Sequence, residues 1–391
     1  MKIAVVGAFG QMGEACLYDL CASPGVTRVL AADRTLARSR AVLRRIPRGR
    51  KARAIALDLA SPAARRKLAG SKVLVNCAWY EFNLEAMKLA LALKAHYVDL
   101  GGLYHMALKQ LRLHPDFRRA GRTAVLGCGS TPGITNMMAA RLAGKLDRLK
   151  SLKIYNVSQD PSEPGGDFLP PFSIRTMLDE GEMPAPVLSG GRLKTVPAFS
   201  AEEAVSFPPP FGRGLAGALI HSELATLPAA YKKKGLKDCF FKLVYPEAVR
   251  RQLSLLMAMG FSSEEPMEIN GARISPRDFL TGMALKGLAK STGIPQDVEM
   301  LRVVAEGSAG GKAVAITSDC SFRSAFGLSA GAMGVGFPAS IAAQMAAAGS
   351  TAPGAFAPES VLPVDPFFKE LERRKIFRLK STARKGGRSN R

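Results

Sequence analysis

The sequence predicts an α/β protein in two parts: a Rossmann doubly wound parallel sheet, and a second α+β domain with a mixed or antiparallel sheet. Two observations predict the first part. Short apolar runs alternate with helical patterns over residues 1–130, and the glycine-rich turn from Gly7 to Gly13 follows the first run. A third observation predicts the second part, because alternating strands and Pro- and Gly-rich loops replace this pattern after residue 145.

The first part begins with a short apolar strand and continues as strand and helix in turn. Apolar runs without alternation are typical of strands that are covered on both faces, and strands separated by helices form parallel sheets. The predicted strands cover residues 2–7, 26–33, 52–59, 72–78, 96–102 and 123–129, and the predicted helices cover residues 11–22, 36–46, 62–70 and 83–95.

The second part combines strands with two late helices. The strands are predicted at 149–160, within 191–210, and as a hairpin within 299–320. The helices are predicted at 330–349 and 365–375. The first of them is rich in small apolar residues, and its stretch GFPASIAAQMAAAG at 336–349 is shorter than the roughly 18 residues of a membrane span, so we expect a buried helix.

The composition favours a globular protein with reduced thiols. The chain has 391 residues, 47% of them apolar, and six cysteines without a CxxC pair, so neither a disulfide framework nor a zinc or other metal site is expected. No signal peptide and no membrane-spanning run is seen in this sequence. These features predict a cytoplasmic protein without a membrane partner.

The net charge of +23 raises the question of a nucleic-acid partner. The cations gather at residues 33–53 and in the segment 377–391, where no aromatic residues interleave in the first cluster and neither holds a nucleic-acid-binding motif. A solvated helix face and a disordered basic tail are therefore expected, and nucleic-acid binding is not.

The glycine turn and a later acid together predict a dinucleotide site. Gly7 would make the turn after the first strand, Gly10 would let a pyrophosphate approach the backbone, and Gly13 would bring the helix close to the sheet. Asp33 ends the second strand, where its carboxylate can accept both ribose hydroxyls and repel a 2′-phosphate, which favours NAD. Further candidate cofactor contacts from the same loop are Phe9, Gln11 and Met12.

Other strand ends add candidate cofactor contacts, each with an alternative. Arg34 can pair with a 2′-phosphate, so NADP remains the alternative cofactor. Asp58 and Leu59 could flank the adenine, although Asp58 could equally cap the next helix. Cys77 and Ala78 should lie near the ribose on the nicotinamide side, unless they only end a strand.

The segment after the strand at 123–129 is a candidate substrate site. Thr131 is expected to be a helix N-cap with Pro132 in the first helical position, so that free N–H groups point into the cleft. A carboxylate or an amide could bind there. An ordinary strand-to-helix connection without a ligand is an equally good interpretation of this segment. The other candidate substrate-binding residues in it are Gly129, Gly133 and Asn136.

Several blocks in order along the chain resemble the saccharopine dehydrogenase-like family, and most of all lysine 6-dehydrogenases. The blocks are VLVNCAWYEFNLEAMKLALALKAHYVDLGG, AVLGCGSTPGITNMMAARLA, HSELATLP, GFPASIAAQM and PESVLPVDPFFKELERR. The resemblance implies a split Rossmann domain at 1–130 and 328–376, a substrate and dimerisation domain at 131–327, and a homodimer. It also implies hydride exchange between a nicotinamide cofactor and the C–N carbon of an amino acid or amine.

Amine oxidation needs a base, and four residues are candidate catalytic groups. His221 would be that base, with a simple hydrogen-bonded histidine as the alternative. Cys128 could titrate between two glycines, although a small buried thiol is the competing interpretation. Asp99 could hold a substrate ammonium or cap a loop. Tyr80 could orient the substrate through its phenol.

Trp79 and Arg175 complete the predicted substrate pocket. The indole of Trp79 could line the pocket for an alkylammonium chain. Arg175, at the start of a predicted helix at 170–181, is a candidate for bidentate capture of a substrate carboxylate, and a salt bridge to Asp179 is the alternative.

Three functions are therefore compared. The first is an NAD-dependent amino-acid dehydrogenase that oxidises a lysine-like amine. The second is an NADP-linked reductase that forms a C–N bond by imine reduction, with the basic stretch at 34–53 as the 2′-phosphate site. The third is a dinucleotide-sensing or nucleic-acid-associated protein without turnover.

Overall fold

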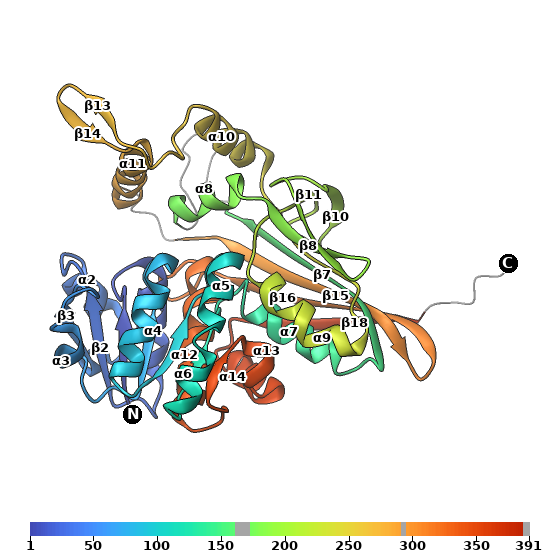
Figure 1. The fold of residues 1–391 in the computed structure, drawn as a ribbon, viewed down its shortest axis with the longest axis horizontal. Coiled ribbons are helices and arrows are strands. Elements are labelled where there is room, and N and C mark those ends of the chain that lie inside the picture. Colours follow the sequence, from blue (N-terminus) through green and yellow to red (C-terminus); the bar gives the residue numbers. More distant parts are fainter. Residues whose placement is uncertain (161–172, 291–294, 386–391) are drawn as a thin grey trace.

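The computed structural model describes residues 1–160, 173–290 and 295–385, and it contains two large sheets (Figure 1). The first three residues of the helix predicted at 170–181 lie outside the described residues. The same holds for residues 386–391 of the predicted tail.

The first sheet has seven parallel strands in the order β17-β6-β5-β4-β1-β2-β3. The strand order reverses between β1 and β4, so the crevice for a ligand lies beyond the carboxyl ends of these two strands. This confirms the predicted doubly wound sheet. The strands are β1 (Lys2–Val6), β2 (Arg28–Asp33), β3 (Ala52–Ala56), β4 (Val73–Asn76), β5 (His96–Asp99), β6 (Thr123–Val125) and β17 (Gly354–Phe356).

Alternate residues of the strands enter two separate cores, one on each face of the sheet. In β1, Ile3 and Val5 belong to one core, whereas Ala4 and Val6 belong to the other. The connections are α1 (Gln11–Ala22), α2 (Ser39–Arg45), a 3-10 turn at Gly49–Lys51, α3 (Ala64–Lys67), η2 (Tyr80–Phe82), α4 (Asn83–Ala92), α5 (Tyr104–Leu111) and α6 (His114–Arg119). The helix predicted at 62–70 is therefore only the short α3.

The chain returns to the first sheet near its end. β17 pairs in parallel with β6, and α12 (Ala330–Ala347) packs along α1. This packing is close, since a Cβ on Gly336 would lie 2.6 Å from the backbone nitrogen of Cys16. The last helices are α13 (Pro358–Val361) and α14 (Val364–Arg373).

The second sheet has nine strands and is mixed. Its main path is β10-β11-β12-β7-β15-β16-β18, and β8 and β9 extend it from β12. Among its described strands, only β12 and β7 pair in parallel. The strands are β7 (Arg148–Gln159), β8 (Ala185–Ser189), β9 (Arg192–Val196), β10 (Glu203–Ser206), β11 (Arg213–Ala218), β12 (Asp238–Val244), β15 (Val298–Ala309), β16 (Lys312–Arg323) and β18 (Arg378–Lys385).

The prediction of a disordered tail from residue 377 is wrong for the residues of β18. This strand pairs antiparallel with β16 over its whole length, and the hydroxyl of Ser381 donates to Ser318 Oγ at 3.0 Å. The pairing satisfies backbone groups that β16 would otherwise leave open at an edge. Because β18 is rich in Lys and Arg and lacks an apolar alternation, its sequence gave no sign of a strand.

Three more helices complete the middle of the chain, together with an arm. The helices are α7 (Ile134–Ala143), α8 (Ile174–Glu182) and α9 (Glu223–Tyr231), with a 3-10 turn at Lys232–Lys234. We define the arm as α10 (Glu247–Ala258), the hairpin of β13 (Met267–Ile269) and β14 (Ala272–Ile274), and α11 (Pro276–Lys290). In Figure 1 the hairpin of the arm projects away from both sheets.

Gly336→Ala should destabilise the chain, because the new methyl group would meet backbone atoms of α1 that cannot move aside. We expect a loss of about 1–3 kcal/mol in the free energy of unfolding, measured by urea denaturation. Gly282→Ala in α11 is the matched control, since no atom lies within 4 Å of its Cβ position. This control should be neutral or stabilising by up to about 1 kcal/mol. Equal losses in both variants would contradict the close packing of α1 and α12.

Candidate cofactor and substrate site

The glycine turn after β1 is closely packed at Gly7 and Gly13. Gly7 has φ +69°, and a Cβ there would lie 2.6 Å from the backbone nitrogen of Ala78. A Cβ on Gly13 would lie 2.1 Å from the carbonyl oxygen of Gly7. These contacts agree with the tight turn and the close helix approach that were predicted.

Gly10 differs from the other two glycines, because the protein itself does not need it to be small. A Cβ on Gly10 would meet only the carbonyl oxygen of Gly7, at an ordinary 3.6 Å. Gly10 is the exposed N-cap of α1 and provides no side-chain cap, so the first N–H groups of α1 can serve a ligand. An uncapped helix N-terminus with open space before it fits the pyrophosphate of a dinucleotide.

Asp33 lies beside this turn at the end of β2. Its Oδ2 accepts a hydrogen bond from the backbone N–H of Phe9 at 3.0 Å, which fixes the carboxylate against the loop. The neighbouring Arg34 is exposed. The expectation that the Phe9 side chain faces the cofactor is wrong, because this ring is 3% exposed and belongs to the core. In the same loop, Gln11 is exposed and Met12 packs partly against that core.

The ends of β3 and β4 lie on either side of β1 and β2 in the sheet. Asp58 is exposed, and its Oδ1 accepts from the backbone N–H of Ala60 at 3.0 Å, so it stabilises a turn and does not cap α3. Leu59 packs partly against the core. Cys77 and Ala78 directly face the Gly7 turn, as the short contacts of Gly7 show.

Asp99 joins the loops that follow β5 and β6. Its Oδ1 accepts from the backbone N–H groups of Gly101 at 3.0 Å and Gly127 at 2.6 Å, and its Oδ2 accepts from Gln110 Nε2 at 2.5 Å. The carboxylate is fully buried, and burial raises its pKa although these three donors and the hydroxyl of Tyr97 oppose this. The arrangement matches the loop-capping alternative, and the full burial of the carboxylate gives no support to a direct catalytic role for Asp99.

The turn from Cys128 to Gly133 is held by its own backbone. The N–H of Gly129 donates to the carbonyl of Pro132 at 2.8 Å, and a Cβ on Gly133 would lie 2.1 Å from the carbonyl oxygen of Gly129. The thiol of Cys128 is fully buried and contacts the carbonyl of Pro338, and burial raises its pKa well above the usual value. Cys128 is therefore the small buried thiol of the competing interpretation.

The predicted cap of the following helix is wrong. α7 begins at Ile134 after Gly133, so Pro132 precedes the helix and follows a cis peptide bond from Thr131. Asn136 accepts from the N–H of Gly133 at 3.1 Å and donates to Glu359 at 2.9 Å, so its amide serves the fold. A tight glycine turn replaced the expected cap, and the side chain of Thr131 instead lies 3.5 Å from Asn156 in the second sheet.

His221 forms a buried dyad with a residue that the sequence did not single out, Glu223. Its Nδ1 hydrogen-bonds Glu223, and its ring stacks on Phe241 at 3.9 Å between centroids. The other oxygen of Glu223 accepts from the hydroxyl of Thr135 at 2.8 Å, which fixes the carboxylate. A carboxylate that orients one imidazole nitrogen leaves the other nitrogen for proton transfer.

The charges around His221 set its protonation. Burial lowers the pKa of His221, but the carboxylates of Glu223 and Glu180 raise it by more, so the net shift is upward. Burial has the opposite effect on an acid, and it raises the pKa of Glu180 to about 7. The group therefore combines an imidazole and two buried acids, an environment that suits a cationic amine. Thr135 places it beside the turn that follows β6, at the edge of the sheet where ligands bind.

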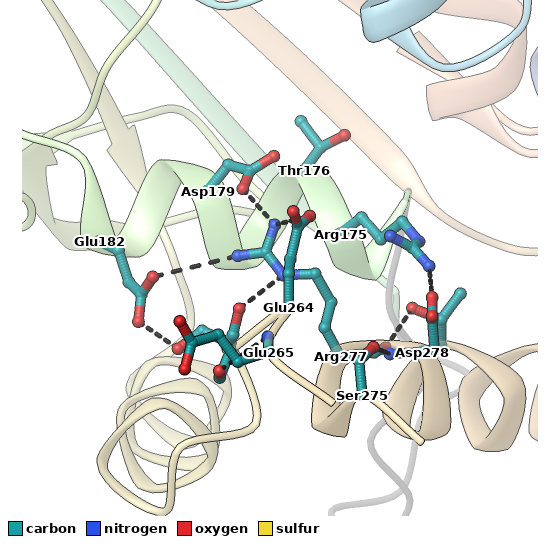
Figure 2. A network of polar contacts seen from close by, with 12 residues as sticks. Arg175, Thr176, Asp179, Glu182, Glu264, Glu265, Ser275, Arg277 and Asp278 are labelled. Carbon is teal, nitrogen blue, oxygen red and sulfur yellow. Dashed lines mark hydrogen bonds and ion pairs between the residues drawn. The ribbon is translucent and has the colours of Figure 1, made fainter. Parts of the chain in front are cut away.

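Tyr80 connects the first sheet to the arm. Its hydroxyl donates to Asp179 Oδ2 at 2.8 Å. Figure 2 shows the next contact, in which Asp179 Oδ1 accepts from Arg277 Nη1 at 2.6 Å. Burial, and then Asp179, raise the pKa of Tyr80, so the phenol stays protonated and acts as a donor. Arg277 also donates to the carbonyl of Ser262 at 2.7 Å and is 6% exposed. Sequence reasoning missed Arg277, because its partner Asp179 lies 98 residues away along the chain.

Arg175 pairs with Asp278 of α11 and not with Asp179, so the predicted alternative is wrong (Figure 2). The guanidinium also lies over the ring of Trp79, 5.2 Å from its centroid. Trp79 thus packs beside Tyr80 under an arginine of α8, and its buried indole N–H lacks a hydrogen-bond partner among the described residues. The role of Arg175 toward a substrate carboxylate stays a prediction.

The structure brings most of the predicted residues to one edge of the first sheet. Asp33 and Asp99 are the last residues of β2 and β5, and Gly7, Cys77 and Gly129 follow the ends of β1, β4 and β6. Among the described residues, no group of three or more His, Cys, Asp or Glu side chains is arranged to hold a metal ion. None of the described helices has the length and apolar character to cross a membrane.

Asp99→Asn should loosen both loops at this edge, because the amide replaces one acceptor oxygen with a donor. We expect a loss of about 1–3 kcal/mol in the free energy of unfolding, measured by urea denaturation, and weaker cofactor binding. Asp116→Asn is the control, since this carboxylate pairs with Arg119 on the surface of α6. A variant at Asp99 as stable as this control would show that the buried carboxylate does not hold the loops.

Comparison with known proteins identifies the family. Residues 3–125 match the model of the saccharopine dehydrogenase NADP binding domain, and residues 129–376 match that of the saccharopine dehydrogenase C-terminal domain. A carboxyaminopropylagmatine dehydrogenase from Synechocystis sp. is 26% identical over 291 residues, 71% of each chain. The fold matches apo saccharopine dehydrogenase (L-Glu forming) from Saccharomyces cerevisiae with a TM-score of 0.75 and 20% identity, over 98% of this chain and 99% of that chain. The chain therefore belongs to the saccharopine dehydrogenase family and is an NAD(P)-dependent oxidoreductase that acts on CH–NH donors.

Proposed function

We propose that the chain oxidises the distal amine of a diamino acid, as in lysine 6-dehydrogenation. NAD accepts the hydride from the carbon that bears this amine. The observation that carries this proposal is the buried dyad of His221 and Glu223 beside Glu180. An acidic environment favours a cationic amine, and a fixed imidazole can take the proton that the amine must lose before hydride leaves. The two named relatives support an amine substrate with a carboxylate.

The residues of the chain divide the work as follows. The N–H groups of α1 and the carboxylate of Asp33 would hold the dinucleotide, and Asp99 fixes the loops that follow β5 and β6. When bound, the cofactor supplies the hydride acceptor. His221 takes a proton from the substrate amine through Nε2, while Glu223 holds Nδ1 and stabilises the imidazolium. Arg175 is the candidate residue to bind the substrate carboxylate. To do so, its guanidinium would leave its ion pair with Asp278.

A cytoplasmic homodimer completes the proposal. All six cysteines are free thiols, which suits a reducing compartment. The homodimer follows from the family resemblance. The competing function is an NADP-linked imine reductase that joins two amino-acid skeletons, and the name of the matched NADP binding domain favours it.

A screen of amino acids and ω-amines for NAD reduction at alkaline pH tests the proposed reaction. We expect turnover with a diamino acid and little with amino acids that lack a distal amine. Reduction of an imine with NADPH, without amine oxidation by NAD, would support the competing reductase. Intact cofactor binding with no turnover in either direction would contradict both.

Asp33 should set the cofactor preference, because its carboxylate accepts ribose hydroxyls and repels a 2′-phosphate. Two nearby arginines that could attract the phosphate, Arg38 and Arg45, are paired with Glu14. We expect Asp33→Ala to weaken NAD binding about 10- to 100-fold, measured by fluorescence titration. Glu85→Ala on the exposed face of α4 is the control and should bind normally. Tighter binding of NADP than NAD by the unmodified chain would contradict the assignment.

The pH profile tests His221 as the base. Protonated His221 cannot accept a proton, so kcat/KM should fall as the pH falls through its raised pKa. Glu223→Gln removes the carboxylate that contributes most to the upward shift, so the acid limb should move to lower pH. Glu306→Gln in the second sheet is the control and should leave the limb in place. An unmoved limb in Glu223→Gln would exclude His221 as the group that titrates.

A further inference from the structure

Cations line the edge of the first sheet that is opposite the cofactor site. The strands of a parallel sheet all begin at one edge, and ligands bind beyond the other edge, where the strands end. Six neighbouring strands of this sheet each carry a Lys or Arg as their first residue or within the two residues before it. In the order of the strands from β6 to β3, these residues are Arg122, Lys94, Lys72, Lys2, Arg28 and Lys51. We call them the basic row.

The pairing of the strands places the residues of the row side by side. The N–H of Lys72 donates to the carbonyl of Lys2 at 2.9 Å, and Arg122 Nε donates to the carbonyl of Lys94 at 2.6 Å. Neighbouring strands lie about 4.8 Å apart, so the row extends over about 24 Å. In Figure 1 the N-terminus, next to Lys2, marks this edge on the side away from the second sheet.

No acid neutralises the row from its own edge. None of the residues that begin these six strands, or that occupy the two positions before them, is Asp or Glu. Like charges at this spacing repel each other. The row therefore lowers the stability of the chain unless the fold or a ligand uses its charges.

The fold uses half of the row. Lys2 Nζ donates to the carbonyl of Ala69 at 2.5 Å, and Lys51 Nζ donates to the carbonyl of Ser23 at 2.8 Å. Ser23 is the C-cap of α1, where a cation satisfies a free carbonyl. Arg122 has a similar role through its bond to the loop after α4. These three cations thus support ends of helices and loops.

The other three cations, Arg28, Lys72 and Lys94, have no such role. They are exposed, and within the described part of the chain their side chains form no hydrogen bond or ion pair. The five residues of β1 separate this edge from the glycine turn by about 16 Å, so the phosphates of the dinucleotide are out of reach. Only an anion from outside the chain can neutralise them.

The shape and the surroundings of the row favour a nucleic-acid duplex as this anion. A line of cations matches a linear polymer of phosphates, which a duplex presents at high density. None of the large apolar side chains that the described residues expose begins or directly precedes these strands, so none is available to insert into a lipid surface. The same positions hold no Phe, Tyr or Trp that could stack on unpaired bases, which argues against a single strand.

We propose that the basic row binds the phosphate backbone of double-stranded nucleic acid without reading its base sequence. Five of its six residues lie outside the cation clusters at 33–53 and 377–391, so the sequence pattern does not indicate them. They are spread between residues 2 and 122 and meet only because parallel strands begin at one edge. Neutralised phosphates release their counterions, and this release drives the binding.

Fluorescence anisotropy with a labelled DNA duplex tests the proposal on the full chain. Six phosphate contacts predict that the logarithm of the binding constant falls with the logarithm of the salt concentration with a slope of about −5. The row variant, Arg28→Gln with Lys72→Gln and Lys94→Gln, should weaken binding on the order of 100-fold at low salt and reduce the slope by about 3.

Arg192→Gln with Lys194→Gln and Lys312→Gln is the matched control. It removes the same three charges from exposed residues of β9 and β16, so both variants have the same net charge. The control should bind the duplex like the unmodified chain. Equal weakening by the two variants, or binding that the row variant does not change, would overturn the basic row as the site.

Two further measurements separate the row from other anion sites. Saturating NAD should leave the affinity for the duplex unchanged, because its site lies at the other edge of the sheet, and displacement of the duplex by NAD would overturn the proposal. Vesicles that contain phosphatidylserine should not bind. Binding to these vesicles but not to the duplex would overturn nucleic acid as the partner. The row variant should keep the circular dichroism and the NAD affinity of the unmodified chain, so that lost duplex binding cannot come from unfolding.

Discussion

The close packing of glycine backbones around α1 is the constraint on which the structure depends. Gly13 lets α1 approach the Gly7 turn, and Gly336 lets α12 approach α1 from the other side. α1 is therefore held between the first strand of the chain and a helix more than three hundred residues later. Its N-terminus, the proposed phosphate site, is positioned by contacts that tolerate no added methyl group.

A second constraint acts on the strand ends beside that helix. Asp99 fixes the loops after β5 and β6, and the tight turn at Gly129 and Gly133 directs the chain into α7. Thr135 of α7 then holds Glu223, which in turn holds His221. Tyr80, Asp179 and Arg277 connect the same edge to the arm. Buried polar contacts thus fix residues from four distant segments near this edge.

The sequence predicted what depends on local pattern. The parallel strands, the glycine turn and Asp33 follow from apolar runs and spacing, and the structure shows them at the expected edge. The dyad partner Glu223 and the pair Asp179–Arg277 depend on contacts between distant segments, which one sequence does not reveal. β18 was missed because backbone pairing requires no apolar pattern. Asp99 and Cys128 lie at the strand ends where the sequence predicted them. Both side chains are fully buried, and their contacts serve the fold.

Direct hydride transfer is the central claim, and isotope labelling tests it most directly. A diamino acid that carries deuterium on the carbon bearing its distal nitrogen would be incubated with the enzyme and NAD, and the reduced cofactor examined by mass spectrometry. The account predicts one deuterium on the nicotinamide ring for each substrate oxidised. Reduced cofactor without deuterium, or bound cofactor that is never reduced by any amine, would contradict it.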